Sequence, residues 1–98
     1  MIQVLVHHEV NDYRSWRSVF DAAIDFRHLG GEQSCRVFRK SGDPNTLTLL
    51  FEWENLERAQ RYMNSDELRD KMKQAGVVGT PEIEYLSEMY MVRRSAAD

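Results

Sequence analysis

The stretch IQVLVHHEV, residues 2–10, runs directly into NDYRSWRSVFDAAI, residues 11–24, and the change of pattern between them decides the fold. Residues 2–10 alternate between two faces, as a strand with one buried face does. From residue 13 apolar side chains recur every three or four positions, which is typical of an amphipathic helix. Asn11-Asp12 offers a side-chain oxygen to the first free amides of that helix, and Gly30-Gly31 predicts its end.

The same two patterns return further along the chain. Residues 33–40 and 46–54 alternate, and the turn-rich connection SGDPN at 41–45 predicts a hairpin between them. Residues 46–54 are the more apolar run, so we expect them to form the central strand. Asn55 then caps a short helix, and Asn64 with a glutamate three residues later predicts a capping box for another.

The last part of the chain predicts a loop over 76–81, a fourth strand over 82–92 and a polar tail over 93–98. The element order is therefore βαββαβ within one domain, residues 1–92. This order predicts a ferredoxin-like α+β fold with a four-stranded antiparallel sheet.

Two helical layers cover only one face of such a sheet, so the other face is left without cover by its own chain. We expect the apolar residues on that face to be Leu5, Leu50, Leu86 and Tyr90. A patch of this kind on a small protein predicts a homodimer that associates through the sheet face, with residues 89–92 reaching the partner. Glu52 on this face would pair with Arg36 or Lys40 across the interface.

Composition excludes several classes of function. The net charge is −3 and the basic residues are scattered among acidic ones, so the chain offers no phosphate-binding surface and no nucleic-acid partner is expected. No apolar run is long enough to cross a membrane, which predicts a cytoplasmic protein with no membrane partner. The lone Cys35 forms no internal disulfide and is expected to be a buried thiol. Adjacent His7 and His8 point to opposite faces, so this pair predicts no metal site.

Four segments resemble a known superfamily: HEVNDYRSW at 8–16, GDPN at 42–45, FEWENLERA at 51–59 and AGVVGTPE at 75–82. They are similar to small bacterial proteins of the dimeric α/β-barrel superfamily, which includes antibiotic-biosynthesis-monooxygenase-like proteins, polyketide cyclases and haem-degrading enzymes. The resemblance covers about residues 1–90 and implies a ligand cleft between the helices and the sheet. Haem-degrading members carry a histidine on the helix after the third strand, and here that helix offers Tyr62 and Met63, so no cofactor is expected.

Two polar residues are candidates for chemistry in such a cleft. His8 shares a strand face with apolar residues, where a neutral imidazole serves as a general base or hydrogen-bonds a ligand, unless it is a core histidine bonded to the backbone. Arg27 is suited to clamp a carboxylate or phenolate, or simply to stabilise the end of its helix. The ligand-binding wall would comprise Trp16, Phe38, Trp53, Tyr62 and Met63, residue types that at these spacings also build cores.

These observations predict a homodimeric protein that binds a small aromatic or apolar metabolite. If it is an enzyme, we expect cofactor-free oxygenation or cyclisation, in which His8 moves a proton and Arg27 stabilises oxyanion charge. Two alternatives remain: a protein that binds the ligand without turning it over, and a pure dimerisation module whose cleft is filled by its own side chains.

Overall fold

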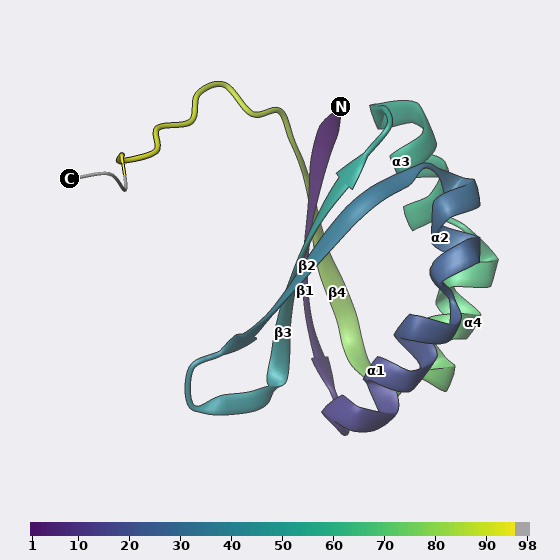
Figure 1. Cartoon of the computed structure of the whole chain (residues 1–98). Helices are drawn as coiled ribbons and strands as arrows, with labels where there is room; N and C mark the ends of the chain where they lie inside the picture. The colour runs from purple at the N-terminus through teal and green to yellow at the C-terminus, as the bar shows by residue number, and fades with distance from the viewer. Residues whose placement is uncertain (96–98) are drawn as a thin grey trace.

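One antiparallel sheet and four helices make up residues 1–95, the part of the chain that the computed structural model describes. In chain order the elements are β1 (Ile2–Val10), α1 (Tyr13–Ala22), α2 (Ile24–Gly30), β2 (Glu32–Lys40), β3 (Asp43–Trp53), α3 (Leu56–Met63), α4 (Asp66–Gln74) and β4 (Val77–Leu86). The strands lie in the order β2-β3-β1-β4, and all the helices lie on one face of the sheet (Figure 1). The predicted ferredoxin-like α+β fold, with β3 as an inner strand, is confirmed.

The core lies between the helices and the sheet face that they cover. The alternation read from the sequence places Val4 and Val6 of β1 on that face, where they are fully buried. Their direct partners on β3, Phe51 and Leu49, are buried because directly paired antiparallel residues share a face, and Leu47 and Trp53 are buried on the same face of β3. This register also brings His8 to the covered face, opposite Leu47.

The first helical segment is broken, which the sequence pattern did not predict. The chain leaves regular helix at Ala23, between α1 and α2. The carbonyl of Phe20 accepts from the Ala23 amide at 3.2 Å and also from the guanidinium of Arg27. A side chain that inserts into the ladder of helical hydrogen bonds bends a helix. The predicted end is confirmed, since Gly31 adopts the left-handed conformation with φ 116°.

The loop that connects β2 and β3 is shorter than predicted. The chain reverses at Ser41-Gly42, and the predicted turn residues 43–45 belong to β3. The Asp43 carboxylate accepts from the Asn45 amide at 3.0 Å and the Thr46 hydroxyl at 2.6 Å. These bonds hold an irregularity in the β2–β3 pairing, so the Asp-Pro-Asn sequence marks a bulge and the turn lies just before it.

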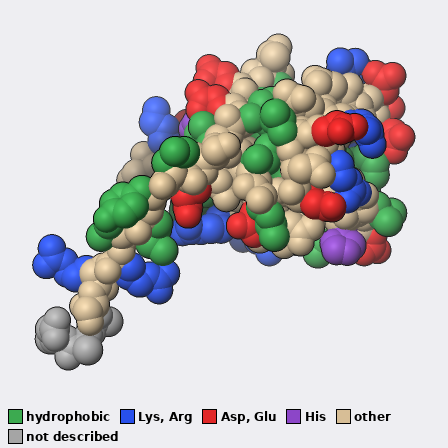
Figure 2. All heavy atoms as spheres, turned by 90° about the horizontal axis from the view of Figure 1, so that it is seen from above, with side chains coloured by type: hydrophobic (Ala, Val, Ile, Leu, Met, Phe, Trp, Pro, Cys, Tyr) green, Lys and Arg blue, Asp and Glu red, His purple; other side chains and the backbone are tan. Residues whose placement is uncertain are grey.

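The fourth strand begins and ends earlier than predicted. Strand β4 spans Val77–Leu86, so the predicted loop at 76–81 is mostly strand and residues 87–95 form no regular element. The exposed segment contains Met89, Tyr90, Met91 and Val92, and Figure 2 shows it projecting from the body of the molecule. The alternation of 87–92 is real in the sequence, yet no strand within residues 1–95 pairs with it. Of the predicted polar tail at 93–98, residues 96–98 lie outside the described residues.

The cap of the last helix also differs from the prediction by one residue. Asn55 caps α3 as predicted, because its side chain accepts from the Arg58 amide. The cap of α4 is Ser65, whose hydroxyl accepts from the Leu68 amide at 3.2 Å, whereas Asn64 ends α3.

The sheet face away from the helices carries the predicted apolar residues of β1 and β3. Leu5 and Leu50 are direct neighbours on adjacent strands and are half-buried, and Leu86 at the end of β4 is exposed. The predicted fourth member, Tyr90, lies in the projecting segment beyond β4. Within residues 1–95, no helix has the length and apolar character that a membrane crossing requires.

Candidate functional site

A cavity lies between the covered face of the sheet and the four helices. It offers about 60 Å³ to the centres of water-sized molecules, within an empty space of about 530 Å³ that is partly open to solvent. The smaller figure is several times the roughly 10–15 Å³ that one water molecule needs by the same measure, so the cavity has room for a small ligand. Most of the lining is apolar, and the polar exceptions are His8, Arg27, Tyr62 and Lys71.

His8 is the least satisfied polar group in this cavity. Its side chain is 8% exposed, and neither ring nitrogen has a hydrogen-bond partner within residues 1–95. Burial lowers the pKa of the imidazole from 6.5 to about 4, because the charged form loses its hydration. The ring is therefore neutral at pH 7, with one donor and one acceptor available. Buried polar groups normally find a partner, so this arrangement favours a ligand or water at His8.

A local irregularity of the sheet accompanies His8. The pairing of β1 with β4 shifts register between His7 and Glu9, and β4 contains Gly79 with φ 72° at this point. Bulges of this kind interrupt the ladder and re-aim nearby side chains, and they recur beside functional sites. The pairing with β3 continues undisturbed, since His8 stands opposite Leu47.

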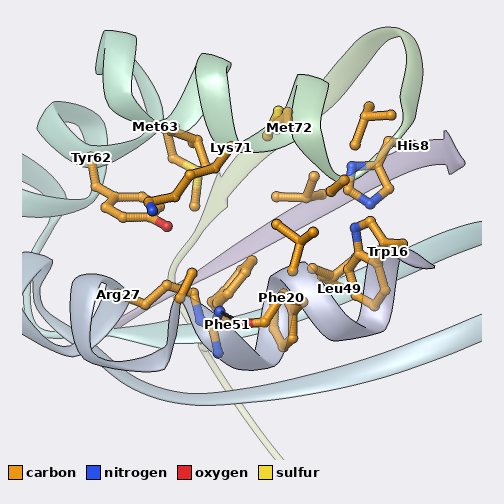
Figure 3. Close-up of a pocket in the computed structure, with 16 residues that line it drawn as sticks. His8, Trp16, Phe20, Arg27, Leu49, Phe51, Tyr62, Met63, Lys71 and Met72 are labelled. Atoms are coloured by element: carbon orange, nitrogen blue, oxygen red, sulfur yellow. Dashed lines mark hydrogen bonds between the residues drawn. The ribbon is translucent and has the colours of Figure 1, made fainter. Parts of the chain in front are cut away.

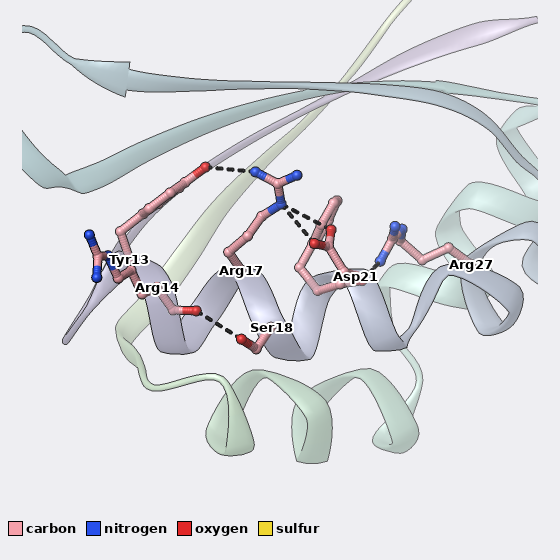
Figure 4. A network of polar contacts seen from close by, with 7 residues as sticks. Tyr13, Arg14, Arg17, Ser18, Asp21 and Arg27 are labelled. Atoms are coloured by element: carbon pink, nitrogen blue, oxygen red, sulfur yellow. Dashed lines mark hydrogen bonds and ion pairs between the residues drawn. The ribbon is translucent and has the colours of Figure 1, made fainter.

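Helix α1 supplies the aromatic wall beside His8. Trp16 is buried, its ring lies 5.8 Å from that of His8 in an edge-on arrangement, and it stacks on Phe20 at 4.8 Å. The outward face of the same helix is polar: Arg17 donates to Asp21 at 2.9 Å and to the Tyr13 hydroxyl at 3.3 Å (Figure 4). The helix thus presents its aromatic side to the cavity, as the predicted stripe requires.

Arg27 is held by the protein itself. Its Nε donates to the buried carboxylate of Glu32 at 2.6 Å, and Nη1 donates to the Phe20 carbonyl. The guanidinium also lies over the Phe20 ring, 3.6 Å from its centre. Arg27 lines the cavity, but its charge is already balanced by Glu32, and its contacts tie α2 to α1 and β2. This geometry gives Arg27 a structural reason to be buried.

The far end of the cavity is formed by α3 and α4. Tyr62 and Met63 of α3 line it, Lys71 of α4 lies beside them, and Met72 lies further towards His8 (Figure 3). Burial raises the pKa of the Tyr62 hydroxyl, so that group is neutral. His8 and Trp16 lie at the other end in the same view.

Two predicted wall residues lie elsewhere. Trp53 is fully buried behind Phe51 and Tyr62, with its ring centre 5.7 Å and 4.7 Å from theirs, and its Nε1 donates to the Gly30 carbonyl at 2.9 Å. Phe38 lies on the opposite face of the sheet, because it pairs with Thr48, and Thr48 pairs with the outward-facing His7. The structure therefore brings five of the seven candidates to the cavity: His8, Arg27, Trp16, Tyr62 and Met63.

Sequence reasoning missed the polar partners of the site. Glu32 follows the helix-ending glycines and carried no periodic signal of burial. Lys71 did carry a periodic signal of burial, since positions 68, 71, 72 and 75 fall on one helical face and three of the four residues there are apolar. Cys35 is half-buried as an inert thiol, because desolvation and the nearby Glu32 raise its pKa to about 12. No cluster of metal-binding side chains occurs in the described part of the chain.

Comparison with known proteins gives a match in structure. No protein-family model matches the chain, and no curated protein matches it in sequence. A candidate antibiotic biosynthesis monooxygenase from Bordetella bronchiseptica is similar with a TM-score of 0.75 and 16% identity, over 91% of this chain and 97% of that one. A cofactor-independent oxygenase from Streptomyces nogalater is similar with a TM-score of 0.67 and 14% identity, over 99% and 97% of the two chains.

A third solved structure contains a ligand. It is a monooxygenase from Streptomyces coelicolor in complex with nanaomycin D, similar with a TM-score of 0.68 and 16% identity, over 96% of this chain and 92% of that one. The likeness spans nearly the whole of each chain and is one of fold. The chain therefore has the ferredoxin-like fold of the antibiotic-biosynthesis-monooxygenase-like proteins, which confirms the resemblance read from the sequence at the level of fold.

Proposed function

We propose that this protein binds a small aromatic metabolite in the cavity beneath its helices, with a hydroxyl or other polar group of the ligand hydrogen-bonded to His8. The observation that carries this proposal is the buried His8 ring, whose two nitrogens have no partner in residues 1–95. The apolar and aromatic lining supplies the rest of the binding free energy, because it removes the ring of the ligand from water.

Ligand binding comes before catalysis in this proposal. A phenol has a pKa near 10, and the pKa of His8 is about 4. Full transfer of the phenol proton to His8 would therefore cost about 8 kcal/mol if binding left both pKa values unchanged. His8 is therefore better suited to accept a hydrogen bond than to take the proton. The catalytic version, cofactor-free oxygenation or cyclisation with His8 as base, draws support from the likeness in fold to a cofactor-independent oxygenase and a monooxygenase, and it requires the ligand to raise the pKa of His8.

The test of this proposal is binding of simple hydroxyarenes, measured by native mass spectrometry. We expect phenols with a single ring to bind, and His8→Leu to weaken them by about 5- to 10-fold, the value of one hydrogen bond. Methyl ethers of the same rings have no hydroxyl proton to donate, so His8→Leu should weaken their binding much less. His7→Leu is the matched control, since His7 lies on the other face of the sheet. Equal binding by the wild type and His8→Leu would contradict the proposal, as would a panel in which nothing binds.

We also propose that a second copy of this chain covers the outer face of the sheet. The support is the apolar pair Leu5 and Leu50 together with the exposed segment 87–95. Charge favours one arrangement. The outer face carries Arg36 on the edge strand β2, and Glu82 and Glu84 on the opposite edge strand β4. A two-fold axis parallel to the strands lays β2 of each subunit over β4 of its partner, so opposite charges meet.

A further inference from the structure

The charges around the cavity do not cancel. The Arg27 guanidinium is paired with Glu32 at 2.6 Å, and His8 and Tyr62 are neutral. This leaves the ammonium group of Lys71 as the unbalanced charge among the described lining residues. Lys71 makes no ion pair in residues 1–95, although the exposed Glu67 lies one turn earlier on α4.

The surroundings of Lys71 are largely aromatic. Its side chain is half-buried, and Nζ lies 4.9 Å from the centre of the Phe26 ring. Phe26 in turn packs against Tyr62, with the ring centres 5.1 Å apart, and Figure 3 shows Lys71 extending towards Tyr62. A cation over an aromatic face gains less than a charge-assisted hydrogen bond, so this ammonium group retains most of its capacity to bind an anion.

We propose that Lys71 selects an anionic ligand, whose carboxylate or other acidic oxygen binds the ammonium group while its opposite end reaches His8. This inference rests on the proposed function and specifies the chemical class of the ligand: a small aromatic acid that carries a hydrogen-bonding group away from the acid. The two polar ends of the cavity, His8 beside Trp16 and Lys71 beside Tyr62, match such a molecule, and the apolar lining between them matches its ring (Figure 3).

The anion also changes the chemistry at the other end. A negative charge in a poorly hydrated cavity favours the protonated form of any nearby imidazole. Binding of an acid therefore acts on His8 in the direction that makes it a better base, whereas a neutral ligand leaves it as it is. Lys71 is thus a specificity-determining residue, because its ammonium group favours ligands that carry a negative charge.

The test compares two probes of nearly the same size and shape, the anionic 4-hydroxybenzoate and the neutral 4-hydroxybenzamide, by calorimetry at neutral pH. The wild-type protein should bind the benzoate about 10- to 100-fold more tightly, the value of a charge-assisted hydrogen bond. Lys71→Met should bring that ratio close to one, mainly by weakening the binding of the benzoate, and Lys71→Arg should keep most of the preference. Lys73→Met, a change at an exposed lysine of the same helix, should leave the ratio as it is in the wild type.

The outcomes separate this inference from the proposed function. If the wild type binds both probes equally, or if Lys71→Met keeps the preference for the benzoate, Lys71 does not select an anion and the aromatic pocket stands. If the wild type binds neither probe, the proposed function as an aromatic-ligand-binding protein is wrong, and the proposed selectivity of Lys71 fails with it.

Discussion

His8 shows how one residue links stability to the site. Its position on the covered face of β1 follows from simple alternation, and burial there lowers its pKa to about 4. The sequence predicted its face and its neutral state. It did not predict that both nitrogens would lack a partner, because that depends on which side chains of the covering helices lie around the ring.

The lowered pKa of His8 predicts a specific dependence of stability on pH. The unfolded chain takes up a proton near pH 6.5 and the folded one only near pH 4, so stability is complete above about pH 6.5 and falls as the pH is lowered towards 4. Between about pH 8 and about pH 5 the loss from this residue amounts to about 2 kcal/mol. Urea unfolding measures it, and His8→Leu should remove this component while His7→Leu keeps it. An unchanged pH dependence in His8→Leu would contradict the assignment.

The ion pair of Arg27 and Glu32 gives a second prediction at this scale. Glu32→Gln leaves a buried guanidinium without its counter-charge, so the free energy of unfolding should fall by about 3 kcal/mol or more. The double variant Arg27→Met, Glu32→Gln removes both charges and should recover part of that loss, which denaturant unfolding of the full cycle measures. Additive losses in the double variant would show that the two residues are not coupled.

At the scale of elements, the sequence predicted every strand and every helical region, but not the break between α1 and α2 or all of the limits. Periodicity sets which face is buried, and this part of the prediction is confirmed for β1, β3 and β4, whereas Phe38 of β2 was assigned to the cavity and lies on the outer face. The errors lie where side chains act on the backbone: Arg27 interrupts the first helix, and Asp43 moves the hairpin turn. A periodicity pattern contains no information on such bonds.

The cap of α4 offers a matched test of one such error. Ser65→Ala removes the hydroxyl that accepts from the Leu68 amide and should lower the free energy of unfolding by about 1 kcal/mol. Asn64→Ala, one residue earlier, removes no cap and should cost much less. Thermal unfolding of the two variants distinguishes them, and a larger loss at Asn64 would restore the capping box predicted from the sequence.

At the scale of the whole molecule, the proposed dimer explains two features that one chain leaves unexplained. These are the apolar pair Leu5 and Leu50 on the outer face of the sheet, and the projecting segment 87–95. The sequence predicted a dimer from the number of layers and from the apolar residues on the uncovered face. It assigned residues 87–92 to a strand, and the sheet of a partner subunit would give this segment a strand to pair with.

Sedimentation at micromolar concentration tests this assembly. The wild type should sediment as a dimer, and Leu50→Arg should sediment as a monomer, because a charge on the outer face opposes its burial. Leu56→Arg changes an exposed leucine on the helical side and should remain a dimer. A wild-type protein with the mass of one chain would contradict the proposed assembly.

The central claim is that the cavity beside His8 receives a ligand, and the nitrogen resonances of the imidazole test it most directly. In the free protein at neutral pH we predict a neutral His8 ring, and saturation with 4-hydroxybenzoate should shift its nitrogens while those of His7 and His28 stay in place. Unchanged His8 resonances at saturating concentrations of hydroxyarenes, charged and neutral, would contradict the account.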